Sequence, residues 1–186
     1  RLFRSRIAVW LDCDTIVNAD LSPMRLDLLQ SGKTLGMADR GLWHLELMMN
    51  ASNPCKFEPG LWSRLLNSTN FNIGVYAVDL GRWARSGMVE RIESVVAKDN
   101  ACGGQMWTSA DQVPFNVALF LPVLRGEAEE DFIVLDAKWN LDGFGWRQDV
   151  PQEWINAASV MHWSGIYKPW FEHGLNKQLW LPHRDA

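Results

Sequence analysis

The chain has 186 residues, of which 47% are hydrophobic and 22% are charged, and this composition fits a globular domain with a sizeable core. The net charge of −4 excludes the basic surface typical of nucleic-acid binding, and no apolar run reaches the ~18 residues of a membrane span. We therefore expect no nucleic-acid partner, and we expect membrane attachment, if there is any, only through an N-terminal anchor outside this sequence.

The first predicted element is a strand over residues 7–11, with the sequence I-A-V-W-L. An apolar run of this length is typical of a strand buried on both faces in a parallel α/β sheet. Because the chain opens directly on this strand, we expect it to be a fragment whose upstream part is missing. The strand leads into Asp12 and Asp14, whose side chains would point the same way. Two converging carboxylates suit a hard divalent cation, although aspartates after a strand also commonly cap a turn.

The following elements alternate between strands and helices, as in an α/β fold. We predict further strands over residues 15–20, 35–38, 71–78, 132–135 and 159–162, the first of these being a short strand or a turn. Helices are predicted over residues 22–29, 60–66, 89–98, 112–121 and 151–157, with one more helix capped by Asp79. The segment 41–59 is predicted to be a loop with at most one helical turn, and the segment 101–109 is predicted to be a loop.

Polar residues mark two of these elements. Asn72 and Gly74 interrupt strand 71–78, and a glycine inside a strand indicates a bulge or a close approach of ligand or backbone. Asp111 is expected to cap helix 112–121, with Pro114 in the first turn of that helix.

The stretch H-W-S-G-I-Y-K-P-W, residues 162–170, adds a polar group after the last strand. The imidazole of His162 would complete a metal shell begun by the two aspartates. Gly165 would let a backbone N–H approach a phosphate oxygen, and Lys168 would supply positive charge beside it. For His162 or Lys168 taken alone, a core histidine or a solvent-exposed lysine is the simpler interpretation.

Segment 139–146, W-N-L-D-G-F-G-W, is predicted to be an aromatic loop punctuated by glycines. Its tryptophans could stack on a sugar or simply pack in the core, and the same alternatives hold for Trp163 and Trp170. The chain has eleven tryptophans, which permits carbohydrate binding without requiring it.

The three cysteines and two sequons bear on the cellular compartment. Cys13 lies between the two aspartates, while Cys55 and Cys102 could pair in an oxidising compartment. The sequence has no cluster of cysteines and histidines with zinc-binding spacing, which argues against zinc. Sequons at Asn50 and Asn67 would permit N-glycosylation in the secretory pathway.

Five motifs together carry a family resemblance: D-C-D, F-N-I-G-V, D-Q-V-P-F-N, W-N and H-W-S-G-I-Y-K-P-W, in this order. Over residues 7–170 the chain resembles glycosyltransferase family 8, which comprises retaining, metal-dependent nucleotide-sugar enzymes such as glycogenin and the plant galacturonosyltransferases. The resemblance implies an α/β GT-A fold, a Rossmann-like mixed sheet flanked by helices, with its N-terminal strands missing. Residues 1–186 would then be the C-terminal part of one catalytic domain, containing the metal site and part of the donor and acceptor site.

The resemblance also implies which residues bind the metal and the phosphates. Asp12, Asp14 and His162 would be ligands of Mn²⁺ or another divalent cation. Gly165 and Lys168 would hold the diphosphate of the donor.

Other motif residues would serve the sugar side of the site. Asn72 and Gly74 would line the sugar and acceptor side, with Asn116 in a supporting position. Asp111 and Gln112 would lie near the donor sugar, with Gln112 closest to the anomeric carbon.

The function expected from this resemblance is transfer of a hexose or hexuronic acid from a UDP-sugar to a carbohydrate or protein-linked acceptor, with retention. We expect this hexosyltransferase in the Golgi lumen, with the cytoplasm as the alternative. One competing interpretation is a non-catalytic sugar-binding or scaffold domain on the same fold. A metal-dependent phosphohydrolase would need a denser cluster of carboxylates or histidines than the sequence offers.

Overall fold

The computed structural model describes residues 6–41, 43–53, 57–108 and 111–184. The chain forms two compact units, which are described separately below. The first unit comprises Arg1–Asp39, Gly74–Asp79 and Ile133–Ala186, and the second comprises Arg40–Ile73 and Leu80–Phe132.

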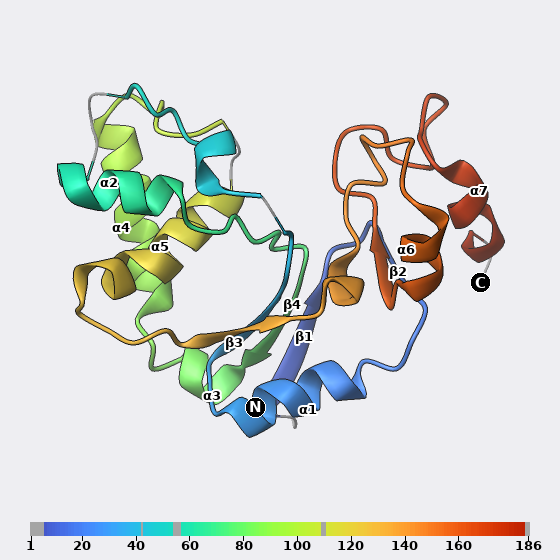
Figure 1. Ribbon diagram of the computed structural model, residues 1–186, viewed down its shortest axis with the longest axis horizontal. Helices are drawn as coiled ribbons and strands as arrows, with labels where there is room; N and C mark the ends of the chain where they lie inside the picture. Colours follow the sequence, from blue (N-terminus) through green and yellow to red (C-terminus); the bar gives the residue numbers. More distant parts are fainter. Residues whose placement is uncertain (1–5, 42, 54–56, 109–110, 185–186) are drawn as a thin grey trace. The chain divides into compact units, whose positions relative to one another are not determined.

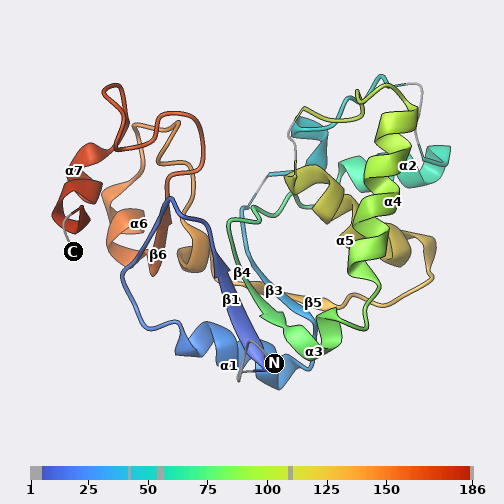
Figure 2. The same ribbon diagram turned by 180° about the vertical axis from the view of Figure 1, so that it is seen from behind.

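A four-stranded sheet forms the base of the first unit (Figures 1 and 2). Its strand order is β1-β4-β3-β5, with bounds Ile7–Leu11, Val75–Asp79, Leu35–Ala38 and Phe132–Leu135. Strand β4 pairs antiparallel with both β1 and β3. Helix α1, Ser22–Ser31, packs against β1, β3 and β4. This helix begins with Pro23 in its first turn and ends at Gly32, whose φ of +68° suits glycine.

Two predictions about this sheet are wrong in detail. Strand β1 pairs antiparallel with β4, and most of its side chains are only partly buried, with Trp10 53% exposed where it stacks on Tyr76. The strand predicted over residues 71–78 begins only at Val75. The reason is that the backbone N–H and C=O of Phe71 are both hydrogen-bonded by the side chain of Asn116, which takes them away from a sheet.

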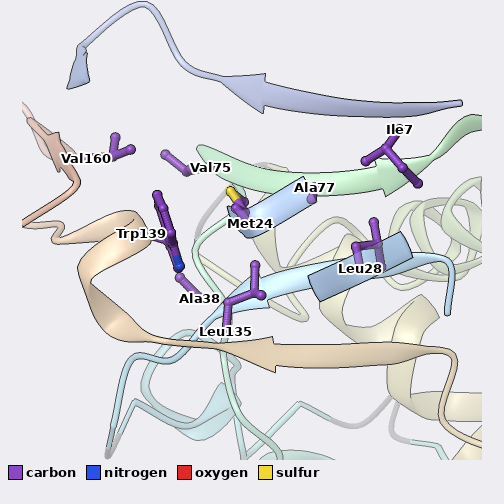
Figure 3. Close-up of a cluster of buried hydrophobic side chains, with 9 residues drawn as sticks. All are labelled: Ile7, Met24, Leu28, Ala38, Val75, Ala77, Leu135, Trp139 and Val160. Atoms are coloured by element: carbon purple, nitrogen blue, oxygen red, sulfur yellow. The ribbon is translucent and has the colours of Figure 1, made fainter. Parts of the chain in front are cut away.

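The core of the first unit lies between helix α1 and this sheet. Figure 3 shows Met24 and Leu28 of α1 beside Val75 and Ala77 of β4, and Trp139 beside the same cluster. Fully buried apolar side chains of this kind are the main stabilising contribution to such a fold. Trp139 therefore packs in the core, so of the two alternatives given for the tryptophans of segment 139–146, core packing is the one that holds for Trp139.

A second, smaller sheet pairs β2, Thr15–Val17, antiparallel with β6, Val160–His162. Around it lie the 3₁₀ helix η2 (Ala137–Asn140) and helix α6 (Gln152–Ala157), followed by α7 (Lys177–Trp180) and η3 (Leu181–His183). Its core consists of Ile16, Phe144, Ala158, Met161 and Trp163. Trp163 is thus packed inside, whereas Trp170 is exposed. The sequence did not predict α7 or η3, which are each a single turn.

The second unit is mainly helical and contains η1 (Leu45–Leu47), α2 (Pro59–Leu66), α3 (Leu80–Trp83), α4 (Met88–Ala101) and α5 (Gln112–Arg125). Helix α5 packs against α2 and α4. The rings of Phe71, Phe120 and Phe132 contact one another in its core. No helix in the described part of the chain is both long and apolar enough to cross a membrane.

Helix α5 begins at Gln112 as predicted, but the side chain of Asp111 does not cap it. Asp111 precedes the helix in a right-handed helical conformation, and its exposed side chain makes no capping hydrogen bond. A capping side chain normally accompanies an extended backbone at this position, which explains the difference. Cys102 is disulfide-bonded and Cys13 is free, while Cys55 lies outside the described residues.

Candidate functional site

Asp12, Asp14 and His162 converge in the first unit. Asp12 directly follows β1, Asp14 directly precedes β2, and His162 ends β6 opposite Thr15. Antiparallel pairing of β2 with β6 therefore brings the distant histidine to the two aspartates. His162 Nε2 lies 3.3 Å from Asp14 Oδ1 and 3.8 Å from Asp12 Oδ2. One ligand atom from each of the three residues lies within 4.8 Å of the others.

The buried imidazole of His162 is oriented by Asn140. Asn140 Oδ1 lies 3.0 Å from His162 Nδ1 and accepts its hydrogen. The Nε2 atom of the same ring faces the two aspartates. A histidine that donates from one nitrogen and offers the other is the usual arrangement of a metal ligand. Asn140 was not among the predicted site residues, although the W-N motif contains it.

Gly74 gives the imidazole its space. A Cβ atom built on Gly74 would collide with Cε1 of His162 and lie 2.7 Å from Asp12 Oδ2. The backbone oxygen of Gly74 also accepts a hydrogen bond of 2.8 Å from the Asp12 N–H. The close approach predicted for this glycine is therefore to the candidate metal ligands, at the entrance to β4.

Lys168 contacts the same group. Its ammonium donates a hydrogen bond to Asp14 Oδ2 and a second one, of 2.8 Å, to the backbone oxygen of Trp163. Burial of Asp14 raises its pKa, but hydrogen bonds and charges from His162 and Lys168 outweigh that effect and lower the pKa to about 2. Asp14 is therefore ionised at neutral pH, and Lys168 is not the solvent-exposed lysine of the simpler interpretation.

Gly165 lies on the loop between His162 and Lys168 with a φ of +105°. A Cβ atom there would lie 2.8 Å from Cδ1 of Trp146 and 2.9 Å from the backbone of Gly145. The glycine is thus required by its backbone conformation and by the loop packed against it. Its predicted contact with phosphate stays a prediction.

The donor set of the first unit fits a divalent cation. Two carboxylates and one imidazole are donor groups by which proteins hold divalent cations. Lys168 compensates part of the carboxylate charge from the side of Asp14. Among the described residues, this is the group of carboxylates and histidine close enough to hold such an ion.

A second polar network lies within the second unit. Asn116 is fully buried, and its amide accepts from Phe71 N at 3.0 Å and donates to the backbone oxygens of Phe71 and Gln112 at 2.8 Å. Gln112 Nε2 donates to Asn70 Oδ1 at 2.9 Å. The Nδ2 atom of Asn70 is buried and has no hydrogen-bond partner within the described ranges. Asn72 is also buried.

The predicted residues are thus divided between the two units. The first unit brings together Asp12, Asp14, Gly74, His162 and Lys168, with Gly165 on the loop that carries Lys168. The second unit contains Asn72, Asp111, Gln112 and Asn116. Sequence reasoning missed Asn70, Asn140 and the carbonyl of Trp163, and a backbone carbonyl has no sequence signal.

Comparison with known proteins places these motifs in context. The family model for glycosyl transferase family 8 matches residues 5–174. Probable galacturonosyltransferase 7 of Arabidopsis thaliana is 29% identical over 184 residues, which cover 94% of this chain and 26% of that protein. Probable galacturonosyltransferase-like 7 of Arabidopsis thaliana is 28% identical over 194 residues, which cover 96% of this chain and 48% of that protein.

Solved structures share the fold. The glycosyltransferase GlyE of Streptococcus pneumoniae superposes with a TM-score of 0.59 at 18% identity, covering 98% of this chain and 40% of that one. The chain therefore spans between about a quarter and a half of the length of the proteins it matches.

Proposed function

The chain belongs to glycosyltransferase family 8 and has the α/β GT-A fold, and on that premise we propose that it is part of the catalytic domain of a hexosyltransferase. The reaction proposed is transfer of a hexose or hexuronic acid from a UDP-sugar to a carbohydrate or protein-linked acceptor, with retention at the anomeric carbon. The observation that supports it best is the convergence of Asp12, Asp14, His162 and Lys168.

The aspartates and the histidine are proposed to hold a divalent cation, with Mn²⁺ the best match to their donor atoms. Such a cation, when bound, offsets negative charge on the diphosphate. Asn140 keeps Nε2 of His162 directed at the site, and Gly74 leaves room for the ring. The three ligand side chains are therefore preorganised by contacts of their own unit.

Lys168 is proposed to stabilise the leaving diphosphate. Breaking the bond between sugar and phosphate leaves negative charge on the phosphate oxygens, and a fixed ammonium beside them lowers the energy of the transition state. The side chain is 24% exposed and held by two hydrogen bonds, so little reorganisation is needed. An ammonium has three N–H donors, and Asp14 and Trp163 accept two of them, so the third would donate to a phosphate oxygen.

Residues of the second unit are proposed to serve the sugar. Gln112 and Asn72 offer amide groups, which suit the hydroxyl groups of a sugar. Asp111 has an exposed carboxylate without a capping role, which leaves it available to a substrate. Asn116 is fully buried and its amide is hydrogen-bonded to the backbone of Phe71 and Gln112, so we assign it a supporting role.

The Golgi lumen is proposed as the compartment. A disulfide at Cys102 favours an oxidising environment. The sequon residues Asn50 and Asn67 are both exposed, as an acceptor of N-glycans must be.

A donor-hydrolysis screen on the full-length protein tests the proposal. UDP-sugars are supplied one at a time with Mn²⁺, and release of UDP is measured. We expect turnover with a restricted set of donors, and its loss in the variants Asp14→Asn and His162→Ala. Asp27→Asn, which changes an exposed carboxylate on α1, is the matched control and should retain turnover.

Absence of turnover with every donor, in protein that binds Mn²⁺, would instead favour the scaffold alternative.

A further inference from the structure

Trp146 is an exposed indole held in a fixed position. It is 43% exposed, yet two glycines with positive φ lie against it. A Cβ atom on Gly143 would come within 3.0 Å of Cε2 and Cζ2 of the ring, and a Cβ atom on Gly165 within 2.8 Å of Cδ1. One part of the indole therefore rests on bare backbone, while the remainder faces solvent.

The loop that carries Trp146 is tied to the loop that carries Lys168. Gly143 N donates to Ser164 Oγ at 2.9 Å, and Gly145 N donates to the backbone oxygen of Ser164 at 3.0 Å. In return, Tyr167 N donates to the backbone oxygen of Gly145 at 2.9 Å. These bonds place Trp146 at a fixed position beside the segment that ends in the proposed phosphate contact.

Arg147 and Trp154 extend the same surface. The guanidinium of Arg147 lies 5.6 Å from the ring centre of Trp146 and 5.8 Å from that of Trp154. A guanidinium between two aromatic rings is a stabilising cation–π arrangement. Trp154 is 49% exposed, so the three side chains form a partly exposed group that we call the aromatic platform (Trp146, Arg147 and Trp154).

We propose that the aromatic platform binds a pyranose ring of the acceptor saccharide, which stacks on Trp146. This inference rests on the proposed transfer of a sugar at the neighbouring metal and lysine group. Exposed, preorganised tryptophans offer a large apolar face at low entropic cost, and the C–H face of a pyranose ring is complementary to it. Arg147 supplies hydrogen-bond donors beside the ring for hydroxyl or carboxylate oxygens.

Two variants of the full-length protein test the platform in different ways. Trp146→Ala removes the stacking face. Gly143→Ala keeps the indole but adds a Cβ atom 3.0 Å from Trp146 and from Cδ of Arg147, at a positive φ that strains alanine, and so shifts the platform. Trp170→Ala tests the other exposed tryptophan that could stack on the sugar, because Trp170 is exposed to a similar extent and contacts Phe171 and Trp180 instead of the platform.

Binding is measured by titration calorimetry with an oligogalacturonide and with a malto-oligosaccharide of equal length, and thermal melts confirm that each variant is folded. We expect at least one oligosaccharide to bind the wild type, and Trp146→Ala and Gly143→Ala each to weaken that binding by roughly tenfold, the scale of one lost aromatic contact. The oligosaccharide that binds identifies an acidic or a neutral acceptor.

Hydrolysis of the UDP-sugar by water separates this inference from the proposed function. The rate of this hydrolysis should be unchanged in Trp146→Ala, since the variant affects only binding of the acceptor. In the transfer reaction, the KM for the oligosaccharide acceptor should rise while kcat changes little. The inference is overturned if neither oligosaccharide binds the wild type, if both platform variants bind like the wild type, or if Trp170→Ala loses as much affinity. Loss of donor hydrolysis in the wild type would overturn the proposed function alone, because the calorimetric titration needs no turnover.

Discussion

Lys168 donates a hydrogen bond to Asp14 across 154 residues of sequence and thereby joins the last motif of the chain to the first. The ammonium group is anchored on its other side by the backbone oxygen of Trp163. One carboxylate oxygen of Asp14 thus faces His162 while the other faces Lys168. Asp14 is therefore shared between the candidate metal position and the lysine, which makes the behaviour of Lys168 variants informative.

The first prediction concerns Lys168→Ala. If the ammonium stabilises the leaving diphosphate, its loss should lower kcat of the full-length enzyme by ~10²-fold or more, since it acts on charge that develops in the transition state. Stability should also fall, by about 1–3 kcal/mol, because a charge-assisted hydrogen bond to the buried Asp14 is lost. Steady-state donor hydrolysis and chemical denaturation measure the two effects.

Lys168→Arg is the companion variant. Its guanidinium keeps the charge but differs in size and geometry from a compact ammonium, so it should restore only part of the turnover. Near-normal turnover in Lys168→Ala would remove Lys168 from the reacting site.

A second prediction concerns metal affinity without nucleotide. Because Lys168 partly neutralises Asp14, a divalent cation must bind beside a positive charge. Lys168→Met removes that charge and should tighten Mn²⁺ binding by roughly tenfold or more, because unit charges ~4 Å apart near a protein surface interact by about 4 kcal/mol and about 1.4 kcal/mol already corresponds to tenfold in affinity. Titration calorimetry or the Mn²⁺ paramagnetic resonance signal measures the change. Weaker binding in this variant would show that the lysine positions Asp14 for the cation instead of competing with it.

A third prediction uses Gly74. The added methyl group of Gly74→Ala would collide with the imidazole of His162 and crowd Asp12, so Mn²⁺ affinity should fall at least tenfold although all three ligands remain. Gly60→Ala is the matched control, since nothing lies within 4 Å of a Cβ atom there and alanine favours helix α2. The control should bind Mn²⁺ like the wild type and melt slightly higher. Equal Mn²⁺ affinity in the two variants would mean that His162 is not a ligand.

The fourth prediction concerns Asn140, which orients the imidazole of His162. Asn140→Ala would free the ring to rotate and to exchange tautomers, and should weaken Mn²⁺ binding by about 10–100-fold. Asn140→Asp keeps an oxygen acceptor at the same place and should retain most of the affinity. If the two variants bind Mn²⁺ equally weakly, the hydrogen bond to Nδ1 is not what holds the ring.

Local sequence patterns predicted most of the fold. The apolar runs of β1 and β3 and the proline and glycine that bound α1 specify their elements within a few residues. The strand predicted from Phe71 was placed too early, because the backbone of Phe71 is hydrogen-bonded to the side chain of Asn116, which lies 45 residues further along the chain. Such a contact has no local pattern, and an apolar segment with aromatic and β-branched residues then resembles a strand.

The candidate site was predictable where side-chain chemistry alone identifies it. Asp12, Asp14 and His162 are typical metal ligands, and the structure brings them together through the pairing of β2 with β6. The partner of Lys168 was not predictable, because the choice between phosphate, solvent and Asp14 depends on three-dimensional distances. Which tryptophans are buried was not predictable either, since only packing in three dimensions distinguishes the buried Trp139 from the exposed Trp146.

The fifth prediction separates a supporting residue from a substrate residue in the second unit. Asn116→Ala leaves both backbone groups of Phe71 unsatisfied in a buried position, and should destabilise the protein by about 2–4 kcal/mol. Gln112→Ala breaks a single side-chain hydrogen bond to Asn70 and should cost only about 1 kcal/mol. Denaturation curves of the two variants therefore establish which amide is structural.

Turnover should follow the opposite order once folding is taken into account. If Gln112 lies beside the anomeric carbon, Gln112→Ala should lower kcat of the full-length enzyme by ~10²-fold while its melt changes little, because an amide that stabilises the reacting sugar is lost. Asn116→Ala, measured well below its melting temperature, should keep a larger share of kcat per folded molecule. Both rates are obtained from donor hydrolysis with the fraction folded determined in the same buffer. A folded Gln112→Ala enzyme with wild-type kcat would remove Gln112 from the sugar site and leave the amide network of the second unit with a purely structural role.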